Sequence, residues 1–91
     1  MSELTLESSL RLHPRVSVRP EPFGALLYNF GTRQLSFLKS PQLLAVVEQM
    51  TAASTVDQAL HAAGVPEADF PQYLRALQTL CASDMLVEEA A

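Results

Sequence analysis

The sequence predicts an α+β domain of winged-helix type, in which a three-stranded antiparallel sheet is followed by three helices. From Leu12 to Leu38, apolar and polar residues tend to alternate, as they do along strands with one buried face. After Ser40, apolar residues recur every three or four positions, which is the spacing of an amphipathic helix. Because each element has one apolar face, the helices must cover one face of the sheet and leave the other in water.

The three expected strands occupy the first half of the chain. The first runs from Leu12 to Arg19 and alternates between valine and polar residues. A hairpin follows, and its first arm extends from Gly24 to Phe30. Gly31 and Thr32 have the chemistry of a turn, and the second arm runs from Arg33 to Leu38. The order of the strands is therefore that of a simple meander.

Each of the three expected helices has a recognisable end signal. Ser40, which precedes a proline, is the expected N-cap of the first helix. Thr55 and Gln58 have the spacing of a capping box at the start of the second helix, and Gly64 is its expected left-handed C-cap. The third and longest helix is expected from Glu67 to Ser83, where apolar residues keep a helical spacing.

The length of 91 residues is sufficient for one modest hydrophobic core. We expect a single domain at residues 12–87, a loosely ordered N-terminus at residues 1–11 and an acidic tail at residues 88–91. The lone cysteine, Cys81, cannot form an internal disulfide, and no charged and apolar leader precedes the domain. No apolar run approaches the roughly 18 residues that span a bilayer. These features predict a cytoplasmic protein with no membrane partner.

The charge of the chain is unevenly distributed. Residues 1–39 carry five basic and three acidic side chains, whereas residues 40–91 carry one basic side chain and seven carboxylates. The formal net charge is −4, and proteins that bind nucleic acids through phosphate contacts need several clustered lysines and arginines. The sequence therefore argues against a nucleic-acid partner.

Residues with catalytic or metal-binding potential are few and isolated. His13 and His61 have no carboxylate or cysteine at the spacing of metal ligands, so we expect both to lie at the surface without a metal. Cys81 lies on an apolar stripe and is expected to pack as a small hydrophobic residue. No glycine-rich phosphate loop is present. We therefore expect no catalytic residues, no metal and no cofactor, and a protein that is not an enzyme.

The amino-acid sequence of the predicted hairpin resembles that of a known family. The stretch RPEPFGALLY at residues 19–28, followed by RQLSFL at residues 33–38, resembles the mycofactocin-system peptide chaperones (MftB). These chaperones belong to the PqqD-like group of RiPP precursor recognition elements. The resemblance extends from about Leu12 to near Leu80. It implies a non-catalytic protein that holds the leader of a ribosomally made peptide and presents it to a radical S-adenosylmethionine maturase.

The resemblance also implies where the leader binds. In a meander the strand Arg33–Leu38 is left at an edge of the sheet. In the family, the leader adds to this edge as an extra strand and lies in the cleft beside the third helix, which is β-augmentation. The expected peptide-binding residues are Thr32, Arg33, Gln34, Leu35, Ser36, Phe37, Leu38, Lys39, Tyr73, Leu74 and Leu77.

Plainer interpretations remain open for these residues. Taken singly, Leu35, Phe37, Leu74 and Leu77 are more typical of a core than of a binding pocket. A tyrosine such as Tyr73 can offer both its ring and its hydroxyl group to a ligand, but it can equally be a core residue.

Two alternative functions use the same element order. One is a winged-helix DNA-binding regulator, which the small number of basic residues in the third helix argues against. The other is a homodimerising adaptor that pairs its edge strand with that of a second copy. Salt-sensitive binding to DNA would favour the first, and competition between peptide and self-association would reveal the second.

Overall fold

The computed structural model describes residues 4–50, 52–53 and 55–88, and it confirms the α+β class. A three-stranded antiparallel sheet has the order β2-β3-β4, and a separate pair of short strands, β1 and β5, forms a second sheet. The strands are β1 (Leu10–Leu12), β2 (Val16–Glu21), β3 (Gly24–Asn29), β4 (Gln34–Leu38) and β5 (Leu86–Glu88). The helices are α1 (Pro41–Gln49), α2 (Val56–Ala62) and α3 (Phe70–Ala82).

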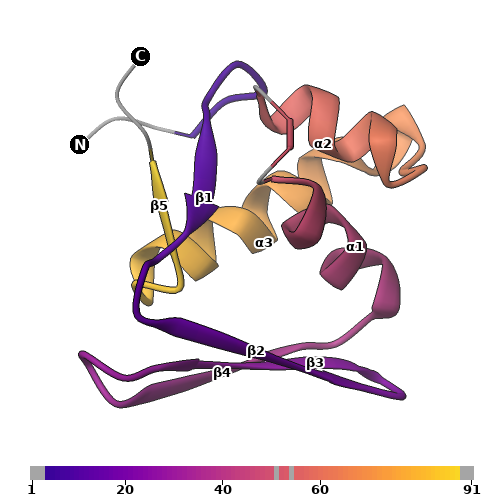
Figure 1. Ribbon diagram of the computed structural model, residues 1–91. Helices are drawn as coiled ribbons and strands as arrows, with labels where there is room; N and C mark the ends of the chain where they lie inside the picture. Colours follow the sequence, from indigo (N-terminus) through magenta and orange to yellow (C-terminus); the bar gives the residue numbers. More distant parts are fainter. Residues whose placement is uncertain (1–3, 51, 54, 89–91) are drawn as a thin grey trace.

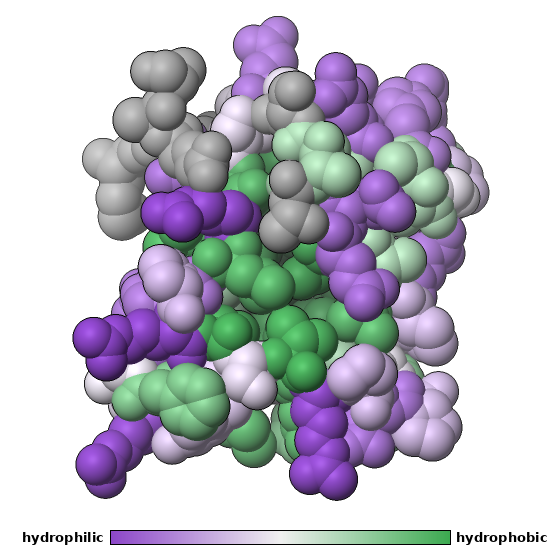
Figure 2. Space-filling model, in the orientation of Figure 1, coloured by the Kyte–Doolittle hydropathy of each residue, from purple (hydrophilic) through white to green (hydrophobic). Residues whose placement is uncertain are grey.

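The two layers of the domain are a sheet and a set of helices on one side of it. All three helices and the small β1-β5 sheet lie on the same side of the three-stranded sheet, whose opposite face is uncovered (Figure 1). Leu27 and Leu38 from the sheet are fully buried together with Val46 of α1 and Leu77 of α3. Seen from the side, apolar residues gather between the sheet and the helices, while polar residues surround them (Figure 2). The core therefore lies between the layers.

A two-residue turn joins β2 to β3. Glu21 pairs with Gly24, so only Pro22 and Phe23 lie between the strands. Gly24 has a φ of 151°, and a Cβ atom at this position would overlap the carbonyl oxygen of Leu38 on β4. Because only glycine lacks a Cβ atom, Gly24 allows β3 and β4 to approach each other at this point.

The turn between β3 and β4 is organised by a buried asparagine. Asn29 is fully buried, and its Oδ1 atom accepts hydrogen bonds from the backbone N–H groups of Gly31 (2.8 Å) and Thr32 (3.1 Å). Its Nδ2 atom donates to the carbonyl oxygen of Asp84 at 2.7 Å. Asn29 therefore ties the hairpin to the segment that follows α3.

The two ends of the described chain are more ordered than the sequence predicts. The sequence predicts a loosely ordered N-terminus at residues 1–11, but Leu4 and Leu10 are buried, and Leu10–Leu12 forms a strand. Residues 1–3 of this prediction lie outside the described residues. The strand Leu10–Leu12 pairs with β5, where the sequence predicts no strand. Glu88, the first residue of the predicted acidic tail, belongs to β5, and residues 89–91 lie outside the described residues. The first strand of the larger sheet also starts later than expected, at Val16. Long-range pairing produces both differences, because three-residue segments carry too little pattern to be recognised locally.

The helix signals agree with the structure. Ser40 Oγ accepts a hydrogen bond from Leu43 N, and Thr55 Oγ1 accepts one from Gln58 N. Gly64, at a φ of 78°, follows the C-cap of α2. The third helix is shorter than expected, because a 3-10 turn at Glu67–Asp69 precedes its start at Phe70.

Candidate peptide-binding site

The strand β4 is an edge of the three-stranded sheet. It pairs with β3 on one side, and no other described strand lies on its second side. In an antiparallel pair, alternate residues of an edge strand direct their N–H and C=O groups away from the partner. The free side of β4 therefore offers backbone hydrogen-bonding groups to an incoming strand.

The side chains of Leu35 and Phe37 lie on the uncovered face of the sheet, not in the core and not toward the helices. They are 54% and 56% exposed, and they pair across the strands with Tyr28 and Leu26. The expectation that they are core residues or line a cleft with α3 is therefore wrong. The physical reason is the period of two along a strand. Leu38 points into the core, so Phe37 and Leu35, which lie one and three positions before it, point to the opposite face.

The other predicted apolar contacts are divided between the core and its border. Leu38 and Leu77 are fully buried, so they support the site from within the domain. Tyr73 and Leu74 on α3 are half-buried and pack against the core. Of the predicted helix residues, Tyr73 and Leu74 are therefore the two with surface that a ligand can reach.

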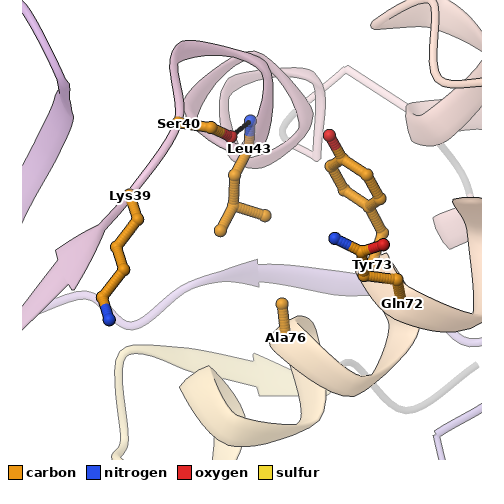
Figure 3. A pocket seen from close by; sticks show the side chains of 6 residues that line it. All are labelled: Lys39, Ser40, Leu43, Gln72, Tyr73 and Ala76. Carbon is orange, nitrogen blue, oxygen red and sulfur yellow. Dashed lines mark hydrogen bonds between the residues drawn. The ribbon is translucent and has the colours of Figure 1, made fainter.

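A pocket of about 280 Å³ lies where the end of β4 and the start of α1 face α3 (Figure 3). The predicted residues Lys39 and Tyr73 both line it. The Tyr73 hydroxyl donates to Gln42 Oε1 at 3.4 Å, and Gln42 Nε2 donates to the carbonyl oxygen of Ala63 at 3.3 Å. These bonds connect α1, α3 and the end of α2 beside the pocket.

Four lining residues were missed by the sequence analysis. They are Ser40, Leu43, Gln72 and Ala76. The positions on α3 follow a signal that the sequence contains, because residues 72, 73 and 76 share one helical face. Ser40 was recognised only as an N-cap, and its place at the pocket depends on how α1 leaves β4.

Two basic side chains flank β4. Arg33 precedes the strand, Lys39 follows it, and both are exposed. Arg33 has a φ of 62°, and its backbone N–H donates to the carbonyl oxygen of Asn29 at 2.7 Å. Thr32 Oγ1 accepts a hydrogen bond from Gln34 N at 3.3 Å. No salt bridge joins Arg33 or Lys39 to another described residue, so both charges are available to a ligand.

The isolated titratable residues show ordinary structural roles. Burial, and secondarily the charge of Glu88, raises the pKa of the Cys81 thiol, which disfavours the nucleophilic thiolate. His61 lies at the surface, 3.5 Å from an Asp57 carboxylate oxygen and 3.6 Å from one of Glu67. In the described part of the chain, no three His, Cys, Asp or Glu side chains come together as metal ligands. None of the described helices has the length and apolar character needed to cross a membrane.

The fold, with three antiparallel strands and a free edge beside three helices, is that of a PqqD-like domain. Within this class, the chain belongs to the peptide chaperone MftB family, whose family model matches residues 9–87. The family is described as one of peptide chaperones, so the chain is assigned to a non-catalytic family of peptide-binding chaperones.

Curated relatives agree with the family assignment. The chain is 52% identical over 86 residues to a peptide chaperone MftB of Mycobacterium tuberculosis, which covers 94% of this chain and 79% of the relative. It is 54% identical over 81 residues to one of Mycobacterium ulcerans, covering 89% and 74% of the two chains. One of Mycolicibacterium smegmatis is 53% identical over 79 residues, covering 87% and 78%. No solved structure matches the chain significantly.

Proposed function

We propose that this chaperone captures the leader of a ribosomally made precursor peptide, the mycofactocin precursor, by strand addition to β4. The observation that carries the proposal is the unpaired side of β4 next to the pocket at α3. An extended leader gains backbone hydrogen bonds from β4, and its side chains alternate between the pocket side and the uncovered face of the sheet. The residues that contact the leader are the predicted residues from Thr32 to Lys39 except the buried Leu38, together with Tyr73 and Leu74.

The second edge of the sheet, β2, is less suited to this role. It contains Pro20, which has no N–H group to donate, and it carries the salt bridge between Arg19 Nε and Glu21 Oε1 at 3.1 Å. Proline and charged side chains are the usual protection of an edge strand against pairing. Gln34 to Leu38 contains neither proline nor a charged residue. The contrast favours β4 as the docking edge.

Backbone pairing alone is insufficient for useful affinity. Micromolar binding corresponds to about −8 kcal/mol, whereas four or five strand hydrogen bonds contribute about 1 kcal/mol each. Ordering a flexible leader costs a further ~2 to 5 kcal/mol. Side-chain burial must therefore supply the difference, and the half-buried pocket residues and the exposed residues of β4 are the surfaces that can do so.

The bound leader is then presented to a radical S-adenosylmethionine maturase. Strand addition leaves most of a longer precursor outside the complex, because β4 has only five residues. The core segment of the precursor thus stays accessible to an enzyme while its leader is held. The family membership supports this order of events, and neither the comparisons nor the charge of α3 supports the DNA-binding alternative.

Amide chemical-shift mapping during titration with the synthetic leader of the cognate precursor tests the proposal. We expect shifts confined to residues 32–39 and to α3, because these segments border the docking position. The strand β2, residues 16–21, is the internal control, since it is the other edge of the same sheet. Shifts concentrated in β2 would assign the leader to the wrong edge and overturn the proposal.

A further inference from the structure

The uncovered face of the sheet is apolar along its docking edge. Four large hydrophobic side chains of the described chain are strongly exposed: Phe23, Phe30, Leu35 and Phe37. The rings of Phe23 and Phe37 lie 6.1 Å apart, and Leu35 is the next outward residue along β4. Edge strands commonly carry charged residues that prevent unwanted pairing, and both outward positions near the middle of β4 lack them. This surface therefore needs an explanation beyond the fold.

A strand added to β4 would bring its own side chains against this surface. Neighbouring strands lie about 4.8 Å apart, and side chains that face the same side of two paired strands contact each other. Every second residue of the guest therefore lies beside Leu35 or Phe37, while the residues between them face the α3 side. Two guest residues, separated by one position, can contact the two exposed side chains at once.

The charges around the edge indicate which occupant fits. Arg33 and Lys39 stand at the two ends of β4 with no salt bridge to described residues, so they complement an acidic guest. A second copy of this chain paired antiparallel through β4 would instead bring Arg33 of one copy toward Lys39 of the other at both ends of the paired strands. Repulsion between like charges disfavours that arrangement. An extended peptide with apolar and acidic residues is the occupant that the surface favours.

We propose that Leu35 and Phe37 form a specificity subsite that accepts large apolar side chains at positions n and n+2 of the bound peptide. The inference rests on the proposed strand addition to β4, and it adds the class of peptide that the edge selects. Peptides with alternating large apolar residues flanked by acidic residues bind. Peptides with polar residues at n and n+2 bind weakly, because Leu35 and Phe37 then remain in water.

The test measures binding of the full chain to a dye-labelled synthetic leader by fluorescence anisotropy. Leu35→Ser and Phe37→Ser should each weaken binding about tenfold, because burial of a large apolar side chain is lost. Phe30→Ser is the matched control. Phe30 is 61% exposed, and its ring lies edge-on to Tyr28 of β3 at 5.0 Å between ring centroids, one strand away from the free side of β4. It should change affinity by less than about twofold.

Two sets of modified peptides separate failure of this inference from failure of the proposed function. Backbone N-methylation at odd or at even leader positions should abolish binding in only one of the two sets, since only alternate amides pair with β4. If neither set weakens binding, strand addition is wrong and the inference falls with it. If one set does, but Leu35→Ser and Phe37→Ser bind normally, the inference alone is overturned.

Alanine substitutions in the leader locate the contact. Alanine at positions n and n+2 should weaken binding to the original chain but have little further effect on Phe37→Ser, as expected for residues in direct contact. An equal loss with Phe30→Ser would contradict an edge subsite. Sedimentation that reveals a dimer dissolved by Phe37→Ser, with unchanged peptide affinity, would assign the face to a second copy and also overturn the inference.

Discussion

At the scale of single residues, Asn29 shows how one side chain positions the turn that precedes β4. It is the polar interruption in an otherwise apolar and aromatic strand, and it is buried without any exposed surface. Its amide group satisfies two backbone N–H groups in the turn before β4 and one carbonyl oxygen after α3. Since buried polar groups need partners, the three bonds must form together for the turn to adopt this geometry.

Replacing this side chain tests the bonding network. Asn29→Ala should reduce the free energy of unfolding by about 2 to 4 kcal/mol, because three backbone groups lose their partner inside the domain. Urea denaturation measures the change. Gln34→Ala is the matched control, since Gln34 pairs with Asn29 across the strands but is exposed. A similar small loss in both variants would show that the network contributes little to stability.

At the scale of elements, the two edge strands differ in their protection. The edge of β2 has a proline and a salt bridge, whereas β4 has only uncharged residues between Arg33 and Lys39, which form no salt bridge with any residue that the structure describes. Proteins that expose an unprotected edge risk aggregation unless the edge has a partner. The unprotected edge of β4 is the feature that the proposed strand addition requires.

Reversing the flanking charges tests their role in peptide binding. Arg33→Glu and Lys39→Glu should each weaken leader binding about two- to fivefold at low salt, because exposed ion pairs contribute up to ~1 kcal/mol. The difference from the original chain should shrink as salt screens the charges. Arg75→Glu, an equal change of charge on an exposed position of α3, should leave affinity nearly unchanged. Unaltered affinity and unaltered salt dependence in the first two variants would disprove an orienting role.

At the scale of the whole molecule, the two ends of the described chain close the fold. Leu12 pairs with Leu86, and both Met85 and Leu86 are buried in the core. The same segment holds Asp84, whose carbonyl oxygen accepts the hydrogen bond from Asn29. The C-terminal segment thus connects the small sheet, α3 and the hairpin in one structure.

Truncating a side chain in β5 tests this closure. Leu86→Ala should lower the free energy of unfolding by about 3 kcal/mol, because it leaves a cavity in the core. The adjacent Val87→Ala, at a half-buried position of the same strand, should cost less than about 1.5 kcal/mol. Urea denaturation of both variants provides the comparison. Equal effects would mean that β5 adds no specific packing to the core.

Local signals in the sequence were sufficient for the larger elements. The caps at Ser40 and Thr55 and the glycine at Gly64 depend on a few neighbouring residues, and the structure contains them as predicted. Strands β1 and β5 were missed because each has three residues and needs a partner more than 70 positions away. The pocket joins β4, α1 and α3, so its complete lining also depends on packing and not on local pattern.

The sequence by itself determined the α+β class, the hairpin that ends in β4 and the basic residues on either side of it, because alternation, capping and turn chemistry are local. Only the tertiary structure decided which side of β4 faces the helices. Because side chains alternate along β4, Leu38 points into the core and Phe37 points out of it. The packing of α1 and α3 on the sheet decides which of the two faces of the sheet is buried. The direction of Leu35 and Phe37 into solvent thus became visible only in the folded chain.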